Sequence, residues 1–235
     1  MRTRSETRLL LRSVMIIALL GVSLAEWAGA QAGGVHSRVP TRIDAGARHV
    51  IYLHGRIIEE QGRRPTSPVW GVYEYQQILD LLASNGFVVI SEQRKRDTDM
   101  DLFAAHVAEQ VRQLMRAGVR PEHVTVVGFS KGGGIATRTS ALLGEQRVNF
   151  VFLAACGDGD FSGSDLRIRG RILSLYEESD DLGRSCHGLF ELSGDTGERT
   201  EEQLHIGGGH GAFYRPHEQW LTPLVQWVRN ARPAG

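Results

Sequence analysis

The stretch 124-VTVVGFSKGGG-134 decides the fold of this chain. Its first four residues are all β-branched and predict a buried strand, and the run from Ser130 to Leu143 predicts a helix. Between them, residues 128–132 (GFSKG) fit the pattern G-x-S-x-G, in which a serine is held on a sharp turn from strand to helix. The pattern is weak alone, and its place between a strand and a helix is the context that supports it.

Strands and helices alternate on both sides of this stretch. Apolar runs predict strands at 49–53, 87–90, 148–154, 172–176 and, more weakly, 202–206. Helices are expected at 73–84, 102–117 and 217–230. Apolar strands that alternate with helices indicate a parallel sheet covered on both faces. The sequence therefore predicts an α/β fold, with a mostly parallel central sheet, no separate lid and one long irregular stretch, Arg56 to Trp70.

Composition excludes several classes of protein. The chain has 235 residues, with 27 Lys and Arg against 27 Asp and Glu, and a phosphate-contacting nucleic-acid binder would show a basic excess. Two cysteines exclude a cysteine-rich zinc module or a disulfide-dense scaffold. No motif suggests a metal site, and we expect no cofactor and no metal.

The first thirty residues differ from the rest. Four arginines precede an apolar run from Val14 to Ala25, which is too short for the roughly 20 residues of a membrane span. Ala28-Gly29-Ala30 fits a signal cleavage site. We expect a signal peptide over 1–30, a flexible segment over 31–47 and one domain over 48–235. A buried helix or an uncleaved anchor are the alternatives for 1–30.

On the basis of these motifs, residues 48–230 resemble the α/β-hydrolase family. In that family the order along the chain is oxyanion loop, nucleophilic serine, acid and histidine. His54-Gly55-Arg56 is similar to the oxyanion loop, Ser130 matches the nucleophile, and His210 within 207-GGGHG-211 matches the histidine. The acid should follow the strand at 172–176, where Asp180 is preferred. The resemblance implies an α/β-hydrolase fold and an oxyanion hole made by the backbone N–H groups of Arg56 and Lys131.

Alternatives stay open at several of these positions. The acid could instead be Asp181, or Asp158 or Asp160 after the preceding strand. We expect Glu177 and Glu178 to be solvated, and the Lys131 side chain to point to solvent. We expect His54 to shape its loop, His205 to be a strand residue that faces a neighbour, and His187 and His217 to lie on the surface or cap a helix.

Two further groups of side chains, one of arginines and one of aromatic residues, each have two possible roles. Arg63, Arg64 and Arg94 could meet an anionic substrate group or be solvated. Five aromatic residues flank the expected catalytic loops and could line an acyl pocket or pack in the core: Trp70, Tyr73, Tyr75, Phe213 and Tyr214.

Cys156 and Cys186 each follow one of two successive expected strands. Both should therefore lie near the carboxyl edge of the sheet, and an exported protein would allow a bond between them. Such a bond requires a Cα separation below about 7 Å. Two separate thiols are the alternative.

The function expected from this sequence is that of an exported serine hydrolase, secreted or periplasmic, which cleaves a carboxylic ester or related acyl bond through Ser130, His210 and Asp180. The partner is a small acyl substrate, without nucleic acid or stable membrane insertion, and the sequence leaves the oligomeric state open. A peptidase or thioesterase with the same triad is one alternative. A non-catalytic binding protein with the same fold is the other.

Overall fold

The computed structural model describes residues 33–157, 163–194 and 197–231. Within them seven strands form one parallel sheet in the order β1-β5-β2-β6-β7-β8-β9. The strands of this sheet are β1 (Val35–His36), β2 (His49–Leu53), β5 (Val88–Ile90), β6 (Val124–Phe129), β7 (Asn149–Leu153), β8 (Arg171–Glu177) and β9 (Arg199–Leu204). A separate antiparallel pair joins β3 (Thr66–Ser67) and β4 (Gly71–Val72).

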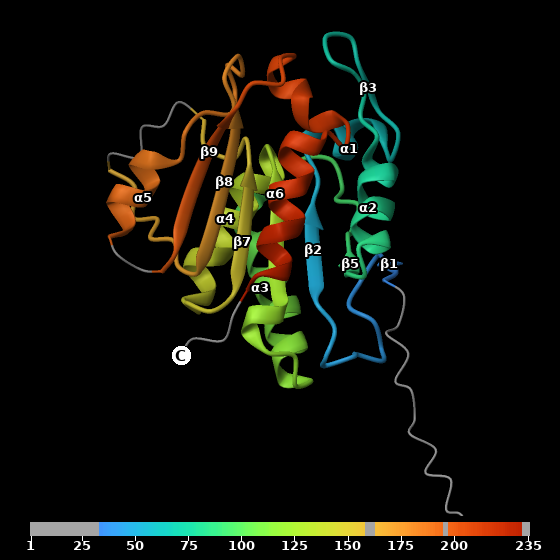
Figure 1. Cartoon of the computed structure of the whole chain (residues 1–235), viewed down its shortest axis with the longest axis vertical. Coiled ribbons are helices and arrows are strands. Elements are labelled where there is room, and N and C mark those ends of the chain that lie inside the picture. Colours follow the sequence, from blue (N-terminus) through green and yellow to red (C-terminus); the bar gives the residue numbers. More distant parts are fainter. Residues whose placement is uncertain (1–32, 158–162, 195–196, 232–235) are drawn as a thin grey trace, which may run out of the picture. The chain divides into compact units, whose positions relative to one another are not determined.

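Helices cover both faces of the sheet, as predicted. They are α1 (Arg56–Gln61), α2 (Tyr75–Ser84), α3 (Met100–Arg116), α4 (Lys131–Leu143), α5 (His187–Ser193) and α6 (Glu218–Arg229), with 3-10 turns η1 (Pro121–His123) and η2 (Gly209–Tyr214). One apolar cluster packs α1, α2 and α6 against one face, and a second packs α3, α4 and α5 against the other. Figure 1 shows α6 in front of the sheet with α3 and α4 behind it.

The central strands are buried because both faces of the sheet are covered. β2 and β7 are buried at every position, and β6 is buried from Val124 to Phe129. Parallel strands with apolar side chains on both faces need helices on both sides. The chain meets this need with the amphipathic helices α2, α3 and α6, whose apolar stripes face the sheet.

The structure departs from the sequence predictions at several places. The stretch Arg56 to Trp70, expected to be irregular, contains helix α1 and strand β3. The short helix α5 was not predicted. Within the segment expected to be flexible, Val35–His36 pairs with β5 at the sheet edge, because an extended chain there finds unpaired backbone groups. The expected signal peptide lies outside the described residues.

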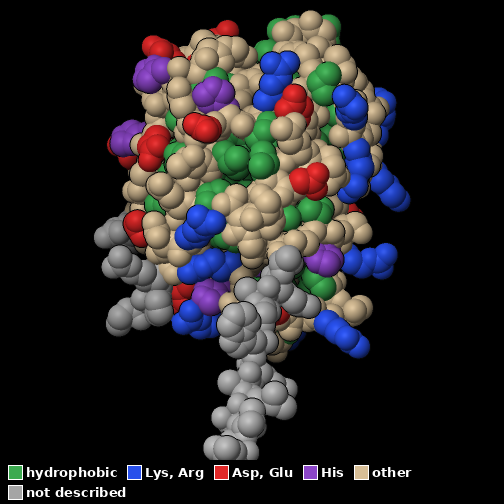
Figure 2. Space-filling view, turned by 45° about the vertical axis from the view of Figure 1, so that its right-hand side comes forward, with side chains coloured by type: hydrophobic (Ala, Val, Ile, Leu, Met, Phe, Trp, Pro, Cys, Tyr) green, Lys and Arg blue, Asp and Glu red, His purple; other side chains and the backbone are tan. Residues whose placement is uncertain are grey.

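Charges of both signs occur on the surface. On the face shown in Figure 2, Lys and Arg side chains gather mainly toward the right-hand edge, and Asp and Glu side chains lie mainly toward the left. No helix in the described ranges is long and apolar enough to cross a membrane.

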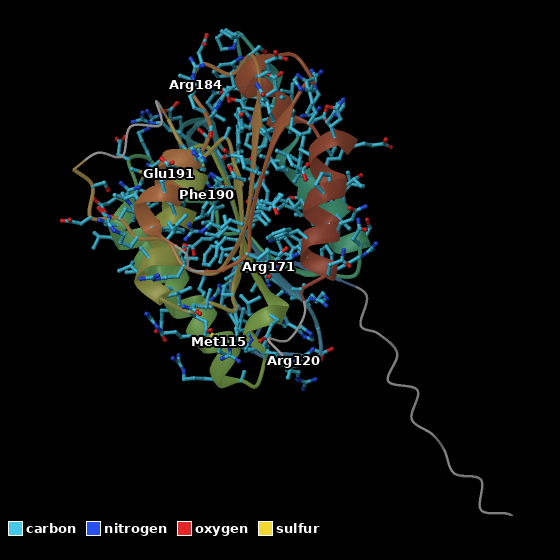
Figure 3. The ribbon with its side chains drawn as sticks, turned by 60° about the vertical axis from the view of Figure 1, so that its left-hand side comes forward. Met115, Arg120, Arg171, Arg184, Phe190 and Glu191 are labelled. Carbon is cyan, nitrogen blue, oxygen red and sulfur yellow. A yellow bond between two sulfur atoms is a disulfide. The ribbon has the colours of Figure 1, made fainter. Side chains whose placement is uncertain are left out.

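The loops that follow the central strands lie at the opposite end of the sheet from the loops that precede them. Arg184 follows β8 and forms an isolated antiparallel bridge with Cys156, whereas Arg120 precedes β6. Figure 3 places these two arginines at opposite ends of the molecule. The loops after β6, β7 and β8 therefore lie together at the carboxyl end of the sheet, where open α/β sheets bind their ligands.

Candidate active site

The turn at Ser130 has the backbone that the G-x-S-x-G pattern predicts. Ser130 lies between β6 and α4 with φ 54° and ψ −120°, a conformation that non-glycine residues rarely adopt. Its N–H donates to the carbonyl of Leu153 at 3.0 Å, which ties the turn to β7. The strained serine is held at the carboxyl edge of the central strand.

The two glycines of the pattern have a steric cause. A Cβ on Gly128 would overlap the backbone of Gly132, and a Cβ on Gly132 would overlap the carbonyl of Leu53 at the end of β2. Neither overlap involves a flexible side-chain end, so only glycine fits both positions. The turn can therefore close tightly and bring the start of α4 against the loop after β2.

His210 and Asp180 form a hydrogen-bonded pair. The Nδ1 atom of His210 lies 2.8 Å from Oδ2 of Asp180, and both side chains are buried. Asp180 lies three residues beyond the end of β8, and its Oδ1 accepts the N–H of Leu182 at 2.8 Å. Because Nδ1–H donates to the carboxylate, the Nε2 atom of His210 is left to accept a proton.

The charge of Asp180 is stabilised despite its burial. Burial alone raises the pKa of this carboxyl, but the hydrogen bond and charge of His210, with backbone N–H groups of Leu182 and Gly183, act in the opposite direction. The net result is a pKa of Asp180 below its ordinary value. The group is therefore an anion at neutral pH, as an acid that orients a histidine must be.

Three more contacts join the loop of the acid to the loop of the histidine. The Glu177 carboxylate accepts the N–H of Gly207 at 3.0 Å, and the Ser179 hydroxyl accepts the N–H of Gly209 at 3.2 Å. Glu178 pairs with His205 at 2.6 Å on the surface. The expectation that Glu177 is solvated is wrong: it is 2% exposed, because the Ser179 hydroxyl and backbone N–H groups replace its water.

The alternative acids lie elsewhere. Asp181 is almost fully exposed and pairs with Arg184 at 3.1 Å. Asp158 and Asp160 lie outside the described residues. Of the carboxylates weighed for this role, the structure brings Asp180 to His210.

The expected oxyanion loop lies against the serine turn. A Cβ on Gly55 would lie 3.8 Å from Cβ of Ser130. Arg56 and Lys131 are the first residues of α1 and α4, so their backbone N–H groups have no partner within those helices. The structure thus brings the two expected oxyanion donors to the same place as the serine.

One cavity of about 860 Å³ joins these groups, because Ser130, His210, Arg56 and Lys131 all line it. Ser130 and His210 share this cavity without a hydrogen bond between their side chains in the described part of the chain. Such catalytic contacts are often long before substrate binds.

The rest of the cavity wall mixes apolar side chains with polar ones, among them the carboxylates of Glu60, Asp97 and Asp99. Trp70, Phe129 and Tyr214 lie around His210, with Trp70 and Phe129 ring centroids 5.4 and 4.9 Å from the imidazole. Of the aromatic residues expected at a pocket or in the core, Trp70 and Tyr214 line the cavity, whereas the remaining three pack in the core: Tyr73, Tyr75 and Phe213. Phe129 was not predicted to line a pocket, although its place beside Ser130 is a signal that could have found it.

The arginines divide between two places. Arg63 and Arg64 line a separate cavity of about 570 Å³. Arg94 is buried and pairs with Glu59 at 2.7 Å, so it is not an exposed anion receptor. The Lys131 side chain does not point to solvent as expected, because its Nζ lies 2.6 Å from the other oxygen of Glu59.

The other histidines lie outside this cavity. His54 is buried beneath the oxyanion loop, and burial with the charge of Arg94 lowers its pKa to about 3, so it stays neutral. His217 caps α6, and His187 is exposed on α5. His205 lies just past the end of β9 and not within a strand as expected, and it faces the neighbouring Glu178.

No group of three or more His, Cys, Asp or Glu side chains in the described ranges could hold a metal ion.

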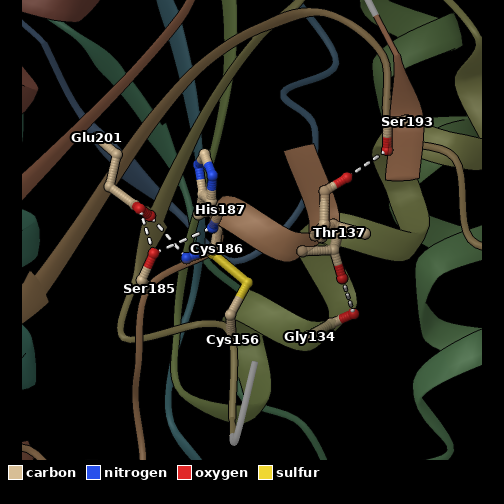
Figure 4. Close-up of a disulfide and its surroundings, with 9 residues drawn as sticks. Gly134, Thr137, Cys156, Ser185, Cys186, His187, Ser193 and Glu201 are labelled. Carbon is tan, nitrogen blue, oxygen red and sulfur yellow. Dashed lines mark hydrogen bonds between the residues drawn. A yellow bond between two sulfur atoms is a disulfide. The ribbon is translucent and has the colours of Figure 1, made fainter. Parts of the chain in front are cut away.

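A disulfide closes the loop that carries the acid. Cys156 and Cys186 are bonded, with an S–S distance of 2.11 Å. Their Cα atoms are 5.2 Å apart, which is within the limit of about 7 Å for a disulfide. Figure 4 shows Glu201 of β9 beside the bond, where its carboxylate accepts from the Ser185 hydroxyl and the Cys186 N–H. The bond therefore ties the segment that carries Asp180, after β8, to the segment that follows β7.

No protein-family model matches the chain, and no curated protein matches it. Solved structures do. SOBER1 from Arabidopsis thaliana superposes with a TM-score of 0.52 at 13% identity, covering 79% of this chain and 99% of its own. XC6422 from Xanthomonas campestris, described as an α/β serine hydrolase without a lid, gives 0.51 at 17% identity over 84% and 88%.

An esterase/lipase from an uncultured bacterium gives a TM-score of 0.52 at 14% identity, covering 82% of this chain and 78% of its own. At such identities the likeness concerns the fold. Together with the parallel sheet and the serine turn after β6, it identifies the architecture of this chain as the α/β-hydrolase fold.

Proposed function

We propose that this protein is an exported serine hydrolase that cleaves a carboxylic ester or related acyl bond through an acyl-enzyme. The observation that carries the proposal is the 2.8 Å hydrogen bond between His210 and Asp180 in the wall of the cavity that Ser130 lines. The solved structures described as a serine hydrolase without a lid and as an esterase/lipase support the same class of reaction.

In the first half of the reaction, Ser130 Oγ attacks the carbonyl carbon of the substrate while Nε2 of His210 takes the hydroxyl proton. The Oγ–C bond forms, the bond from carbon to the leaving oxygen breaks, and His210 returns the proton to the leaving alcohol. Asp180 holds the imidazole in the tautomer that leaves Nε2 free and stabilises the imidazolium. Water then repeats these steps and releases the acid.

The negative charge that develops on the carbonyl oxygen needs donors fixed in advance. The backbone N–H groups of Arg56 and Lys131 are suited to this, since each begins a helix beside Ser130. The apolar part of the cavity wall, with Trp70, Met100 and Leu182, suits the acyl or alcohol part of a small substrate.

Export rests on the first thirty residues and is consistent with the bonded cysteines. Disulfides persist in oxidising compartments, such as the periplasm or the extracellular space. We therefore place the mature protein there, after cleavage near Ala30.

The test is a panel of p-nitrophenyl esters of graded acyl length. The wild type should hydrolyse at least one ester, Ser130→Ala should lose the activity, and Ser84→Ala, an exposed serine on α2, should keep it. Turnover of thioesters or peptides alone would replace the ester by those substrates. A folded wild type inert on all three would support a binding protein instead.

A further inference from the structure

The carboxylate of Glu59 is buried between two cations beside the candidate active site. One oxygen accepts from Arg94 Nε at 2.7 Å, and the other accepts from Lys131 Nζ at 2.6 Å. The side chains of Glu59 and Arg94 are 1% and 0% exposed, and that of Lys131 is 14% exposed. The three residues come from α1, the segment after β5, and α4, so one carboxylate joins three separate pieces of chain.

Through Arg94, this cluster reaches the oxyanion loop. The Arg94 side chain donates to the carbonyl of His54, and its backbone N–H donates to Nε2 of His54 at 3.0 Å. Because Nε2 accepts, the ring proton is on Nδ1, which donates to the carbonyl of Gly55 at 2.8 Å. The Gly55–Arg56 peptide is trans, so its N–H points away from that carbonyl. Arg94 and His54 thereby set the direction of the Arg56 N–H.

Through Lys131, the same carboxylate reaches the serine turn. Lys131 directly follows Ser130 and begins α4. Its ammonium group is held by Glu59 on α1, which also begins beside the oxyanion loop. A single carboxylate therefore fixes α1 against the start of α4.

We propose that Glu59 is a positioning residue that sets the spacing of the two oxyanion donors, the backbone N–H groups of Arg56 and Lys131. This inference rests on the proposed hydrolase function. Glu59 acts through Arg94 and Lys131 and does not itself touch the reacting atoms.

Stability alone is a weak reason for such a cluster. Each buried ion costs several kcal/mol of desolvation, and apolar residues of similar volume often serve as well. Here the charged contacts fix the orientation of the two oxyanion donors. Small displacements of these donors matter, since removing one oxyanion donor lowers kcat by about 10²–10³-fold.

Three variants separate positioning from a simple effect of charge. Glu59→Gln makes the surroundings of the oxyanion one charge more positive, Lys131→Met makes them one charge more negative, and the double variant leaves the net charge unchanged. Lys131→Met keeps its backbone N–H and the Glu59–Arg94 pair. If charge were the only influence, the two single variants would change the rate in opposite directions. Loss of positioning lowers the rate in all three.

A matched control is Glu122→Gln. Glu122 is another buried carboxylate, paired with Arg147 at 3.7 Å just before β6, at the end of the sheet away from Ser130. It reports the effect of losing a buried carboxylate without touching the oxyanion loop.

The measurement is kcat and KM on the best p-nitrophenyl ester, with circular dichroism to verify folding and a boronic acid as transition-state analogue. We expect Glu59→Gln to lower kcat by about 10–10³-fold with KM within about threefold, and to weaken boronate binding in parallel, because the lost interaction acts only in the transition state. Lys131→Met and the double variant should also lose at least about tenfold, and Glu122→Gln less than threefold.

The inference is overturned if an active wild type loses less than threefold in folded Glu59→Gln, or if Glu59→Gln gains while Lys131→Met loses. If Glu59→Gln does not fold, the double variant decides, and a kcat near that of the wild type overturns the inference. A wild type without turnover and without labelling by a fluorophosphonate would instead refute the proposed function, and the inference with it.

Discussion

Reduction of the disulfide between Cys156 and Cys186 should lower the free energy of unfolding by an amount that follows from the length of chain between the two cysteines. The two residues are 30 positions apart. In the chain-entropy model, closing a loop of that length lowers the entropy of the unfolded chain by about 12 cal/mol/K, which corresponds to about 3.6 kcal/mol at 25 °C. For a domain of this size, about 2–4 °C of Tm per kcal/mol gives a shift of about 7–14 °C.

The assay compares urea and thermal unfolding of the protein, isolated from an oxidising compartment, with and without dithiothreitol. Reduction should lower the free energy of unfolding by about 3.6 kcal/mol. The Cys156→Ala/Cys186→Ala variant is the matched control, because dithiothreitol should leave its unfolding unchanged. Two titratable thiols in the unreduced wild type would refute the bond. Equal stability before and after verified reduction would refute the entropic reasoning.

Three further predictions concern the residues around Ser130. His54 has a folded pKa of about 3 against about 6.5 in the unfolded chain, so the stability that it contributes is complete above pH 6.5 and is lost as pH falls toward 3. Its contribution should lower the free energy of unfolding by about 2.6 kcal/mol between pH 7 and pH 4.5, a difference that His54→Asn should remove from the pH profile and that a flat profile would contradict. Asp180→Asn should lower kcat on the order of 10⁴-fold in an ester assay, whereas exposed Asp181→Asn should not, and an active Asp180→Asn enzyme would assign the acid elsewhere. Gly132→Ala should lower Tm and activity because its Cβ would overlap the Leu53 carbonyl. Gly134→Ala should be tolerated, since the nearest neighbour of its Cβ would be Met100 Sδ at 3.4 Å, and equal Tm values for the two variants would contradict this steric explanation.

The sequence was informative where a local pattern carries the structure. The strand, serine turn and helix at 124–143 are visible because β-branched residues, closely spaced glycines and a helical run follow one another. Chain order then leads to Asp180 and His210, since loops after successive parallel strands meet at one edge of the sheet.

Elements with little apolar pattern were harder to predict. β9 was expected at 202–206 and spans Arg199–Leu204, because an edge strand with mostly polar residues has no clear alternation of burial. Helix α1 was missed because its six residues are bounded by glycines and followed by a polar, proline-containing loop.

Buried charges were the least predictable part of the site. Glu59 can be buried because Arg94 and Lys131 pair with its carboxylate. These partners lie 35 and 72 residues away in the chain. Nothing in the local sequence distinguishes such a glutamate from its exposed neighbour Glu60, so a long-range ion pair leaves no local signal. The prediction of a solvated Glu177 is wrong for a related reason, since the N–H of Gly207 that helps to bury this carboxylate lies 30 residues away in the chain.

Whether Ser130 is a nucleophile activated by its surroundings is measured most directly by mass spectrometry of the folded protein after treatment with a fluorophosphonate. An activated serine displaces fluoride from phosphorus and keeps the phosphonyl group on its oxygen. We expect one adduct, on the peptide containing Ser130, which is lost in Ser130→Ala and forms much more slowly in His210→Ala. A folded wild type that stays unlabelled, or is labelled at another residue, would contradict this expectation.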